Sequence, residues 1–589
     1  MPKKNILICT PIKEILPKNN SDTLIYPAQL ISNSINSLTK KYKFKEPDYI
    51  WKNKSLLSKD YLYLNNFYEK SLEKVRKELN KYHRVNFSLK FWRILLGPWL
   101  SIFIFVFFER YKSLKKCFEN YDINQINCLE FKDHKKFIPE DMEDFLNSVK
   151  NDDLWNQNIY QVLINNFFDK KKIKIVSDYK KTISKKKASS ELLKENLLKK
   201  SILKIFEYMP FNKFYKYFIG STHLGMIDEF KLSLKLKQLP IYYFRKKIDF
   251  GLNINFKDRK KMAKNNNFLS YFEKKLFELI FEMMPVAYIE GFEKLNQIVK
   301  KENFPNKPRV IFSSNFLWYD VVTMMYTALN VENGSNLIYG QHGGCYGINK
   351  IMFPEKHETS IADQYISWGW GSRNKKINNL GIILNLRKFS KRKNSDKLLI
   401  VFRPLIKYFF SMESGNGTEQ SQDYILYSQN FFNNLSSKIK KKTILRLHTN
   451  DYKNELFKNF DKKENLKLSN STFVKDCNNS KLIVNTCNST TYLQLLSLNI
   501  PSIVIWNKTN NPIRKEMIKY FNLLNKNNIL FYNSKEAAKF INKIWGDDIH
   551  KWWFSSKTQH AIKIFTEVFA KKNDNIVTHL KKQIISNEI

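Results

Sequence analysis

The chain has 589 residues and a formal net charge of +45 at pH 7, and it contains 46 Phe, 30 Tyr and 11 Trp. Its apolar fraction of 43% excludes a disordered chain, and its length favours two or three domains over a single core. The charge would suit nucleic acid or a membrane surface, but the lysines are spread along the whole chain and no zinc-finger spacing or RNA-recognition signature occurs, which favours compositional bias and solvated faces.

The cysteines and the apolar runs indicate the compartment. No two of the six cysteines have C-x-x-C spacing, which argues against a structural zinc site and for a reducing compartment. Residues 5–10 are too short for a signal peptide, and the apolar run 94–108 is interrupted by Gly97-Pro98 and shorter than a bilayer span. This run predicts a buried helix, with a membrane-facing patch as the alternative. We expect a cytoplasmic protein and leave open a peripheral contact with the anionic inner face of the membrane. The six cysteines are Cys9, Cys117, Cys128, Cys345, Cys477 and Cys487.

The first half of the chain combines a few predicted strands with long helices. Residues 5–10 predict a first strand. Helical spacing is expected over residues 55–118, 154–208 (with a basic, solvated run at 170–187) and 268–284. From residue 309 the pattern changes to strand (309–313), helix (315–330), strand (336–339) and strand (364–370), which is typical of a parallel βαβ unit. We therefore expect an N-terminal Rossmann-like acceptor domain, residues 1–386, with a helical insertion at about 56–290.

A polar segment, residues 387–397, predicts a linker, after which the pattern restarts. Predicted strands lie at 398–402, 443–447, 482–485, 500–506 and 529–532, with helices at 424–438, 489–498 and 534–545. This pattern predicts a second Rossmann-like domain, residues 398–545, which would bind the donor nucleotide. Residues 546–589, which include Trp552-Trp553, should be helical and pack back on the body. The predicted fold is α/β, with two Rossmann-like domains facing a cleft in which ligands sit.

The turn after the strand at 336–339 is the most informative feature. Gln341-His342-Gly343-Gly344 follow this strand, and four of the 16 glycines fall within residues 340–347. The turn places an imidazole at the carboxyl end of a strand, where ligands bind in open α/β sheets. Imidazole titrates near neutral pH, so it can remove a proton from an acceptor hydroxyl or stabilise a departing phosphate. We expect His342 to be catalytic, with a capped strand-end histidine as the alternative. Substrate contacts are expected from Gln341, Gly343, Gly344 and Tyr346.

Polar residues near this turn could complete an active site. Asn315 and Asp320 follow the preceding strand, and Glu355 and Glu358 come after the glycine turn. We expect Asn315 to contact substrate, and Asp320 and Glu358 to act in catalysis, with Glu355 as a further candidate base. A solvated or capping role is the alternative for each.

The second half offers candidate ligands for the phosphates of a donor nucleotide. Arg403 and Arg446 can make bidentate phosphate contacts, and His448 lies where a strand meets its loop. Asn485 ends a strand, and Ser489, Thr490 and Thr491 begin a helix, where free backbone N–H groups attract anions. Ordinary helix capping is the alternative. No P-loop lysine is present, so we do not expect ATP hydrolysis. Cationic side chains and the helix dipole would make a metal ion unnecessary.

At these residues the chain resembles a family of bacterial transferases found with surface-polysaccharide genes, whose signature is a G-Q-H-G-G-x-Y-G segment. Residues 340–347 carry this signature. The resemblance extends to His83-Arg84 and residues 91–100, 109–111, 314–320, 367–370, 488–491 and 552–553. More distantly, the chain is similar to GT-B enzymes such as the CDP-glycerol glycerophosphotransferases and the CMP-Kdo transferases of capsule synthesis.

The resemblance implies a GT-B-like, metal-independent transferase. In it His342 matches a catalytic base, whereas His448 and Ser489-Thr490 match a His-Pro pair and a Ser-Ser turn that bind donor phosphates; here Thr449 replaces the proline, and Gln494 stands where relatives often have Glu. It further implies a CMP- or CDP-linked co-substrate, preferably a CMP-linked acidic sugar, a glycan or lipid-linked acceptor, no other cofactor and no nucleic acid. The alternatives are a CDP-polyol phosphotransferase, a nucleotide-sugar epimerase, or a non-catalytic basic protein that binds nucleic acid or membrane.

Overall fold

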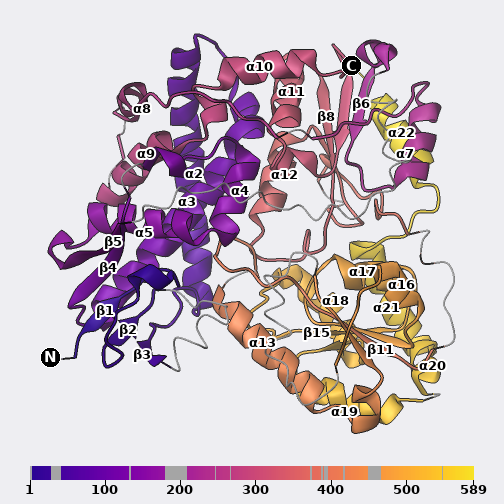
Figure 1. Ribbon diagram of the computed structural model, residues 1–589. Coiled ribbons are helices and arrows are strands. Elements are labelled where there is room, and N and C mark those ends of the chain that lie inside the picture. The colour runs from indigo at the N-terminus through magenta and orange to yellow at the C-terminus, as the bar shows by residue number, and fades with distance from the viewer. Residues whose placement is uncertain are drawn as a thin grey trace.

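The computed structural model describes residues 3–27, 41–131, 134–178, 209–245, 247–264, 267–268, 270–371, 374–386, 389, 395–414, 418–448, 466–546 and 548–588. Across these ranges the chain forms three sheets, and neighbouring strands within each sheet run parallel. In Figure 1 the first sheet lies at the lower left, the second at the upper right and the third at the lower right.

The first sheet corrects the prediction of a purely helical insertion at 56–290. Its strand order is β3-β2-β1-β4-β5, so the N-terminus begins a Rossmann-like unit of its own. Two of its strands, and the first strand of the second sheet, fall inside the segment that we expected to be helical. Its first three strands have three residues each, too few to show an alternating pattern. The strands are β1 (Asn5–Leu7), β2 (Thr23–Ile25), β3 (Lys43–Lys45), β4 (Gln125–Glu130) and β5 (Ile173–Asp178). The helices are η1 (Lys13–Ile15), α2 (Lys54–His83), α3 (Leu89–Asn120), η2 (His134–Phe137), α4 (Met142–Asn151), α5 (Asp153–Phe167) and η3 (Lys170–Lys172).

Helix α3 forms the centre of the largest core. It is long and apolar enough to cross a membrane, but 94% of its most apolar window is buried inside the protein, against α2, α5, α11 and α12. It continues through Gly97-Pro98, and a Cβ on Gly97 would lie only 2.8 Å from His357 and 2.9 Å from Tyr68. The glycine thus allows helices to pack closely, and the expectation of a buried helix is confirmed.

The second sheet has the sequential order β10-β9-β8-β7-β6 and confirms the βαβ pattern predicted from residue 309. Its strands are β6 (Tyr217–Gly220), β7 (Val310–Ser313), β8 (Asn336–Gly340), β9 (Gln364–Ile366) and β10 (Ile377–Asn378). The associated helices are η4 (Pro210–Phe214), α7 (Met226–Lys235), α8 (Phe256–Ala263), α9 (Tyr271–Met283), η5 (Val286–Tyr288), α10 (Phe292–Lys301), η6 (Phe316–Trp318), α11 (Val321–Glu332) and α12 (Phe353–Ile361).

The third sheet, in the order β13-β12-β11-β14-β15-β16, confirms the predicted second Rossmann-like unit. Its strands are β11 (Leu398–Val401), β12 (Thr443–Arg446), β13 (Lys467–Leu468), β14 (Leu482–Asn485), β15 (Ser502–Ile505) and β16 (Leu530–Phe531). Its helices are α13 (Thr418–Asn433), α14 (Ser437–Lys440), α16 (Phe473–Asn478), α17 (Thr490–Ser497), η9 (Lys515–Met517), α18 (Ile518–Lys526) and α19 (Ser534–Ile544). Most of the predicted linker, residues 387–388 and 390–394, lies outside the described residues, as do residues 179–208 of the predicted helical stretch, and the domain boundaries stay a prediction.

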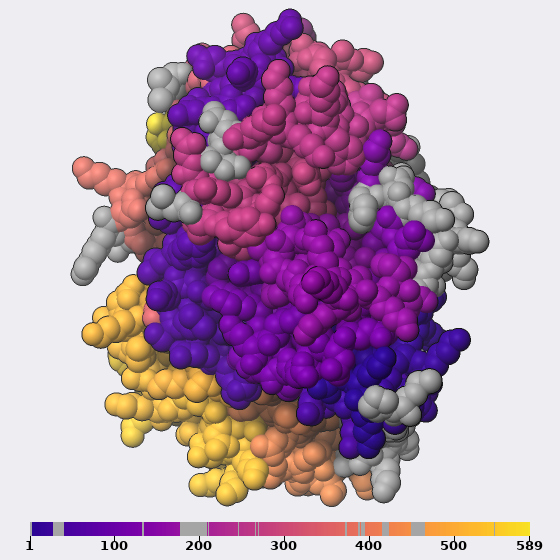
Figure 2. Space-filling view, turned by 90° about the vertical axis from the view of Figure 1, so that its left-hand side faces the viewer, coloured from indigo at the N-terminus to yellow at the C-terminus, as the bar shows by residue number. Residues whose placement is uncertain are grey.

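The C-terminal helices α20 (Asp548–Trp553), α21 (Ser556–Phe569) and α22 (Ile576–Ser586) tie the units together. Helix α21 packs on α17 and α18 of the third unit, and α22 crosses to α7 of the second. Between them the Lys571 N–H donates to the carbonyl of Trp368 (2.8 Å). This gives the α/β, GT-B-like arrangement expected, with the N-terminal sheet as an addition. In Figure 2 indigo to magenta residues cover most of one side and orange to yellow residues lie at its lower end.

Candidate functional site

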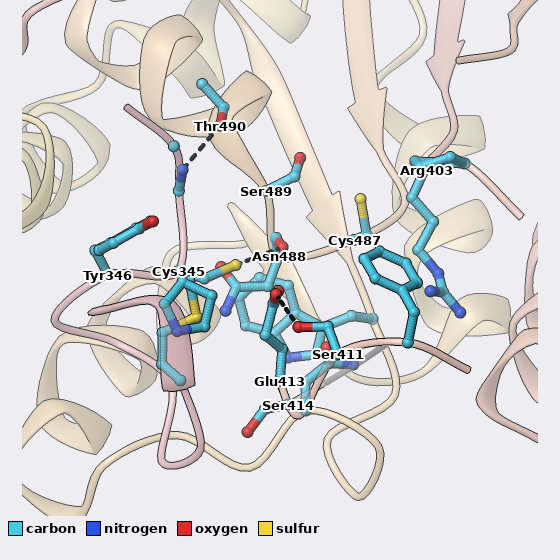
Figure 3. Close-up of a pocket in the computed structure, with 18 of the residues that line it drawn as sticks. Cys345, Tyr346, Arg403, Ser411, Glu413, Ser414, Cys487, Asn488, Ser489 and Thr490 are labelled. Atoms are coloured by element: carbon cyan, nitrogen blue, oxygen red, sulfur yellow. Dashed lines mark hydrogen bonds between the residues drawn. The ribbon is translucent and has the colours of Figure 1, made fainter. Parts of the chain in front are cut away.

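A pocket of about 450 Å³ lies where the carboxyl ends of the second and third sheets meet. Asn315 follows β7 and residues 342–346 follow β8, whereas Arg403 follows β11 and residues 486–490 follow β14. The N-terminal unit adds Lys150 from α4. Figure 3 shows the two sets of side chains facing one another. All three units therefore contribute to one cavity, and the predicted facing of two Rossmann-like units is confirmed.

The predicted substrate ligand Gln341 builds the turn instead of lining the pocket. It is only 1% exposed. Its Oε1 accepts hydrogen bonds from the backbone N–H of Trp368 (3.0 Å) and from Nε1 of Trp370 (2.8 Å), and its Nε2 donates to the carbonyl of Gly343 (2.8 Å). The side chain thus fastens the histidine turn to the segment after β9, and the substrate contact expected of Gln341 stays a prediction.

The second glycine of this turn, Gly344, allows the two halves of the protein to touch. The Gly344 N–H donates to Oγ1 of Thr490 (2.8 Å), and a Cβ on Gly344 would lie 2.4 Å from the carbonyl carbon of Ser489. Next to it, Sγ of Cys345 donates to the carbonyl of Asn488 (3.0 Å); Figure 3 marks both contacts. The start of α17 lies against the backbone of Gly344, where a side chain would not fit. The substrate contact expected of Gly344 stays a prediction.

His342 lines the pocket beside a buried carboxyl group. Its side chain is 24% exposed, and its Nδ1 lies 3.6 Å from Oε1 of Glu358, which is fully buried. Glu358 accepts hydrogen bonds from the Tyr346 hydroxyl (2.7 Å) and from Nε1 of Trp318 (2.7 Å) on Oε1, and from the Tyr365 hydroxyl (3.1 Å) on Oε2. These three donors hold the carboxyl group in place beside the imidazole, and the catalytic role expected for Glu358 stays a prediction.

The environment moves the pKa values of these two groups in opposite directions. Burial, followed by the nearby His223, lowers the pKa of His342 to about 3. Burial raises the pKa of Glu358 to about 8, against the lowering effect of its hydrogen bonds. At neutral pH the imidazole is therefore uncharged and able to accept a proton. The Glu358 carboxyl group keeps its proton at neutral pH and can stabilise an imidazolium by charge only once it ionises, near pH 8.

His223 is a neighbour of the site that the sequence did not indicate. It follows β6, and its ring centroid lies 6.1 Å from that of His342 with the planes 18° apart. Both Ser221 (φ +51°) and His223 (φ +61°) adopt left-handed backbone conformations, which are strained for residues other than glycine and cluster at functional sites. The signal for this residue was a short aromatic strand followed by polar residues and Gly225, inside a segment that we expected to be helical.

The opposite wall of the pocket carries positive charge. The guanidinium of Arg403 lies 4.5 Å from the ring centroid of Tyr424, and Lys150 enters from the N-terminal unit. Burial lowers the pKa of both Arg403 and Lys150. Ser489 precedes α17 and, within the described residues, accepts no capping hydrogen bond from that helix. Glu413 is the one carboxylate among the residues that line the pocket. Two cations and a helix N-terminus in the lining of one pocket suit an anionic ligand.

Two predicted carboxylates have structural partners outside the pocket. Oδ1 of Asp320 accepts from the Val322 N–H (3.3 Å) and Oδ2 from the Thr323 hydroxyl (2.9 Å), so this residue caps α11; burial raises its pKa to about 7. Glu355 pairs with Arg514 at 2.6 Å. Neither carboxylate lines the pocket. Both therefore hold loops and helix ends near the site, and the catalytic role expected for Asp320 stays a prediction.

The predicted donor ligands divide into two groups. Ser489 and Thr490 line the pocket with Arg403, as do Asn315, Gly343, Gly344 and Tyr346 on the first-half side. Arg446 instead pairs with Asp476 (2.6 Å), and His448 is exposed. Neither these two residues nor Asn485 and Thr491 are among those that line the pocket. Their roles in donor binding stay predictions, and Thr449 lies outside the described residues.

Within the described residues no group of three or more His, Cys, Asp or Glu side chains is arranged to hold a metal ion. Metal-independent chemistry stays a prediction. The six cysteines are free thiols, and Cys345 and Cys487 line the pocket.

Comparison with known proteins gives distant structural likenesses and one family. The wall teichoic acid polymerase TagF is 13% identical over 50% of this chain and 84% of its own, with a TM-score of 0.28. Alr3699/HepE of Anabaena, solved with UDP and glucose, is 11% identical over 63% of this chain and 98% of its own (TM-score 0.34). MurG of Acinetobacter baumannii is 9% identical over the same shares (TM-score 0.30). No curated protein matches the chain. The match to the family model of the LIC12162 family transferases covers residues 5–584, and the chain belongs to this family.

Proposed function

We propose that the protein transfers a sugar, or a sugar or polyol phosphate, from a nucleotide-activated donor to a surface-glycan acceptor. One observation carries the proposal: a neutral histidine and a positively charged helix start face the same pocket from opposite sheets. Group transfer to a hydroxyl needs a base at the acceptor and a stabilised anionic leaving group. The two walls of the pocket offer these two functions separately.

In the proposed reaction His342 accepts the proton of the acceptor hydroxyl. The acceptor oxygen then forms a bond to the donor's sugar carbon, or to its phosphorus, while the bond to the nucleotide phosphate breaks. The imidazolium is stabilised by Glu358, whose Oε1 lies 3.6 Å from Nδ1. The departing phosphate is held by Arg403, by Lys150 and by the N-terminus of α17.

The resemblance favours a CMP-linked acidic sugar as the donor, with a CDP-linked polyol as the alternative. Two cations against a single carboxylate in the pocket lining support an anionic donor of either kind. We further propose a cytoplasmic location, a glycan or lipid-linked acceptor, no metal ion and no nucleic-acid partner. The buried Glu358 carboxyl group beside His342, which lines the pocket, supports an enzyme over a non-catalytic basic protein.

Thermal unfolding with CMP, CDP, UDP and GDP tests the proposal. A cytidine nucleotide at 100 times its Kd should stabilise the protein by about 2.7 kcal/mol. The variant Arg403→Gln should lose most of this shift, because its cation lines the pocket. In the control Arg309→Gln, whose parent side chain pairs with Glu588 (2.9 Å) and does not line the pocket, the shift measured against the variant's own ligand-free state should persist. The proposal fails if no nucleotide stabilises the protein or if the shift survives Arg403→Gln.

A further inference from the structure

A second feature of the molecule lies on its surface, along α7 and η4. Large apolar side chains are exposed here in a row; Ile227 is 64% exposed and Phe214 is 84% exposed. Helix η4 lies near the carboxyl end of α7, because the Leu239 N–H donates to the Tyr215 hydroxyl (3.2 Å). We call this surface the α7 face. Its members are Phe211, Phe214, Met226, Ile227, Phe230 and Leu234.

Helix α7 is apolar on two opposite sides. Leu232 and, just after the helix, Leu236 are buried in the core that it shares with β6, β7 and α22. Ile227, Phe230 and Leu234 follow each other at helical spacing on the side that faces solvent. A surface helix that packs on a core on one side normally presents polar residues on the other. Exposed apolar residues on the solvent side of α7 are typical of an interaction surface.

The charges on α7 are sorted by sign. Lys231 and Lys235 are exposed beside the apolar row, and Lys237 follows the helix. Both acidic residues of the helix turn inward: Asp228 is buried, and Glu229 accepts a hydrogen bond from the Thr222 hydroxyl (2.8 Å). The exposed side of α7 therefore combines apolar and positive residues without an exposed acid. This combination complements the interface of an anionic lipid bilayer, in which lysine stems can extend toward the headgroups.

The α7 face also adjoins the proposed active site. Helix α7 begins at Met226, three residues after His223, whose ring lies 6.1 Å from that of His342. Ten residues of helix span about 15 Å. In Figure 1 α7 lies at the edge of the second sheet, beside β6 and α22 and away from the N-terminal unit.

We propose that the α7 face docks the protein on an anionic membrane. Ile227, Phe230 and Leu234 enter the acyl boundary, and Lys231 and Lys235 contact the headgroups. A membrane at this position would present a lipid-linked acceptor to His342; this last clause rests on the proposed function, whereas the docking surface does not.

Vesicle flotation tests the proposal. The full chain is mixed with vesicles of phosphatidylcholine alone or with 30% phosphatidylglycerol, a composition chosen for the assay. The test variant is Ile227→Glu/Leu234→Glu, and the control is Leu62→Glu/Leu426→Glu. Both change the charge by the same amount, and the replaced residues are similarly exposed (64% and 50% against 70% and 62%). We expect wild type and control to float only with the anionic vesicles, and the test variant to bind at least about tenfold more weakly.

Three results would overturn the docking surface. The first is absence of wild-type binding to anionic vesicles, and the second is equal flotation of the test and control variants. The third is self-association of the wild type that the test variant abolishes, which would make the α7 face an interface between two copies. Thermal shifts with nucleotides, measured on the same variants, report separately on the pocket. Loss of flotation with an intact nucleotide shift therefore concerns the α7 face alone.

Discussion

The first and third sheets share an order of strands, but their described residues differ at the carboxyl edge: those of the third line the pocket, whereas those of the first are packed into a core. In both, the central strand has the second strand on one side and the fourth on the other, an arrangement that leaves a crevice at the carboxyl ends. In the third sheet the residues that follow β11, β14 and β15 line the pocket. In the first sheet the corresponding residues Cys9, Thr10 and Tyr26 are completely or almost completely buried.

The first sheet's crevice is filled by a loop from the third unit. Tyr408 packs with the residues around β1 and β2, and its hydroxyl donates to Oδ1 of Asp153 (2.5 Å), which also pairs with Lys407 at 2.5 Å. The same loop continues into the pocket with Arg403 on one side and Glu413 on the other. Strand order therefore specifies where a crevice can form, and the loops decide whether it binds a ligand or becomes a core. The N-terminal unit serves as a support for the loop that carries the cation.

The largest difference in activity is expected between a variant at the carboxyl edge that lines the pocket and a variant at the filled carboxyl edge of the first sheet. His342→Ala should lower kcat by about 10²–10⁴, the usual contribution of a general base, while the nucleotide-induced thermal shift is retained. Thr10→Val, at the filled edge, loses a 2.7 Å hydrogen bond to Gln157 and should cost about 1 kcal/mol of stability with kcat unchanged. Steady-state kinetics and urea unfolding of both variants provide the measurement. Equal losses of activity would remove the distinction between the edges.

The next largest effect concerns Glu358, the buried carboxyl group beside His342. Because burial raises the pKa of Glu358 to about 8, wild-type kcat/KM should rise between pH 7 and 9 as the imidazolium's partner ionises. Glu358→Gln should lower kcat/KM by about 10–100-fold and abolish this rise.

Stability gives a second readout of the same group. The pKa of Glu358 is 4.5 in the unfolded chain and about 8 in the folded protein. Between these two pH values the folded protein holds a proton that the unfolded chain has lost, so wild-type stability falls as the pH rises from 4.5 to about 8. Glu358→Gln should be free of this contribution, which melting curves from pH 5 to 8 can show. A wild-type kcat/KM that is flat from pH 7 to 9 would argue against an ionised Glu358 in the reaction.

The filling of the first crevice can be tested by emptying it. Tyr408 is 3% exposed, so Tyr408→Ala should lower the free energy of unfolding by about 3–5 kcal/mol, as other large-to-small core substitutions do. Tyr408→Phe keeps the ring and loses only the bond to Asp153, at a cost of about 1 kcal/mol. Calorimetric titration of Tyr408→Ala with the stabilising nucleotide should still give one site. Two sites would show that the first crevice is a binding site once it is open.

These two crevices also show what the sequence could and could not predict. Strand β14 was predicted with its observed bounds because three apolar residues and Asn485 come just before the start of a helix. Strand β1 was predicted within residues 5–10, but the rest of the first sheet was missed because β2 and β3 are only three residues long and two long helices separate β3 from β4. His342, Arg403 and Ser489 were found because each follows a strand.

The residues that the sequence did not reveal come from other units or face the other way. Lys150 reaches the pocket from a helix of the N-terminal unit, and His223 follows a strand that was not predicted. Gln341 and Asp320 lie at the right edge of the sheet, but spacing alone does not say that their side chains turn into hydrogen bonds within the protein.

The smallest effect should come from His223, which lies beside His342 at the open edge and lowers the pKa of its imidazole. Asparagine tolerates the left-handed backbone of this position (φ +61°) and carries no positive charge. After burial, His223 is the next cause that lowers the pKa of His342, so His223→Asn should raise that pKa and move the acidic limb of kcat/KM to higher pH. At pH 7 kcat should change only a few-fold, since the imidazole is still neutral there. A large loss of kcat with an unmoved acidic limb would mean instead that His223 touches the substrate, and the histidine pair would then act on the reaction as two catalytic residues.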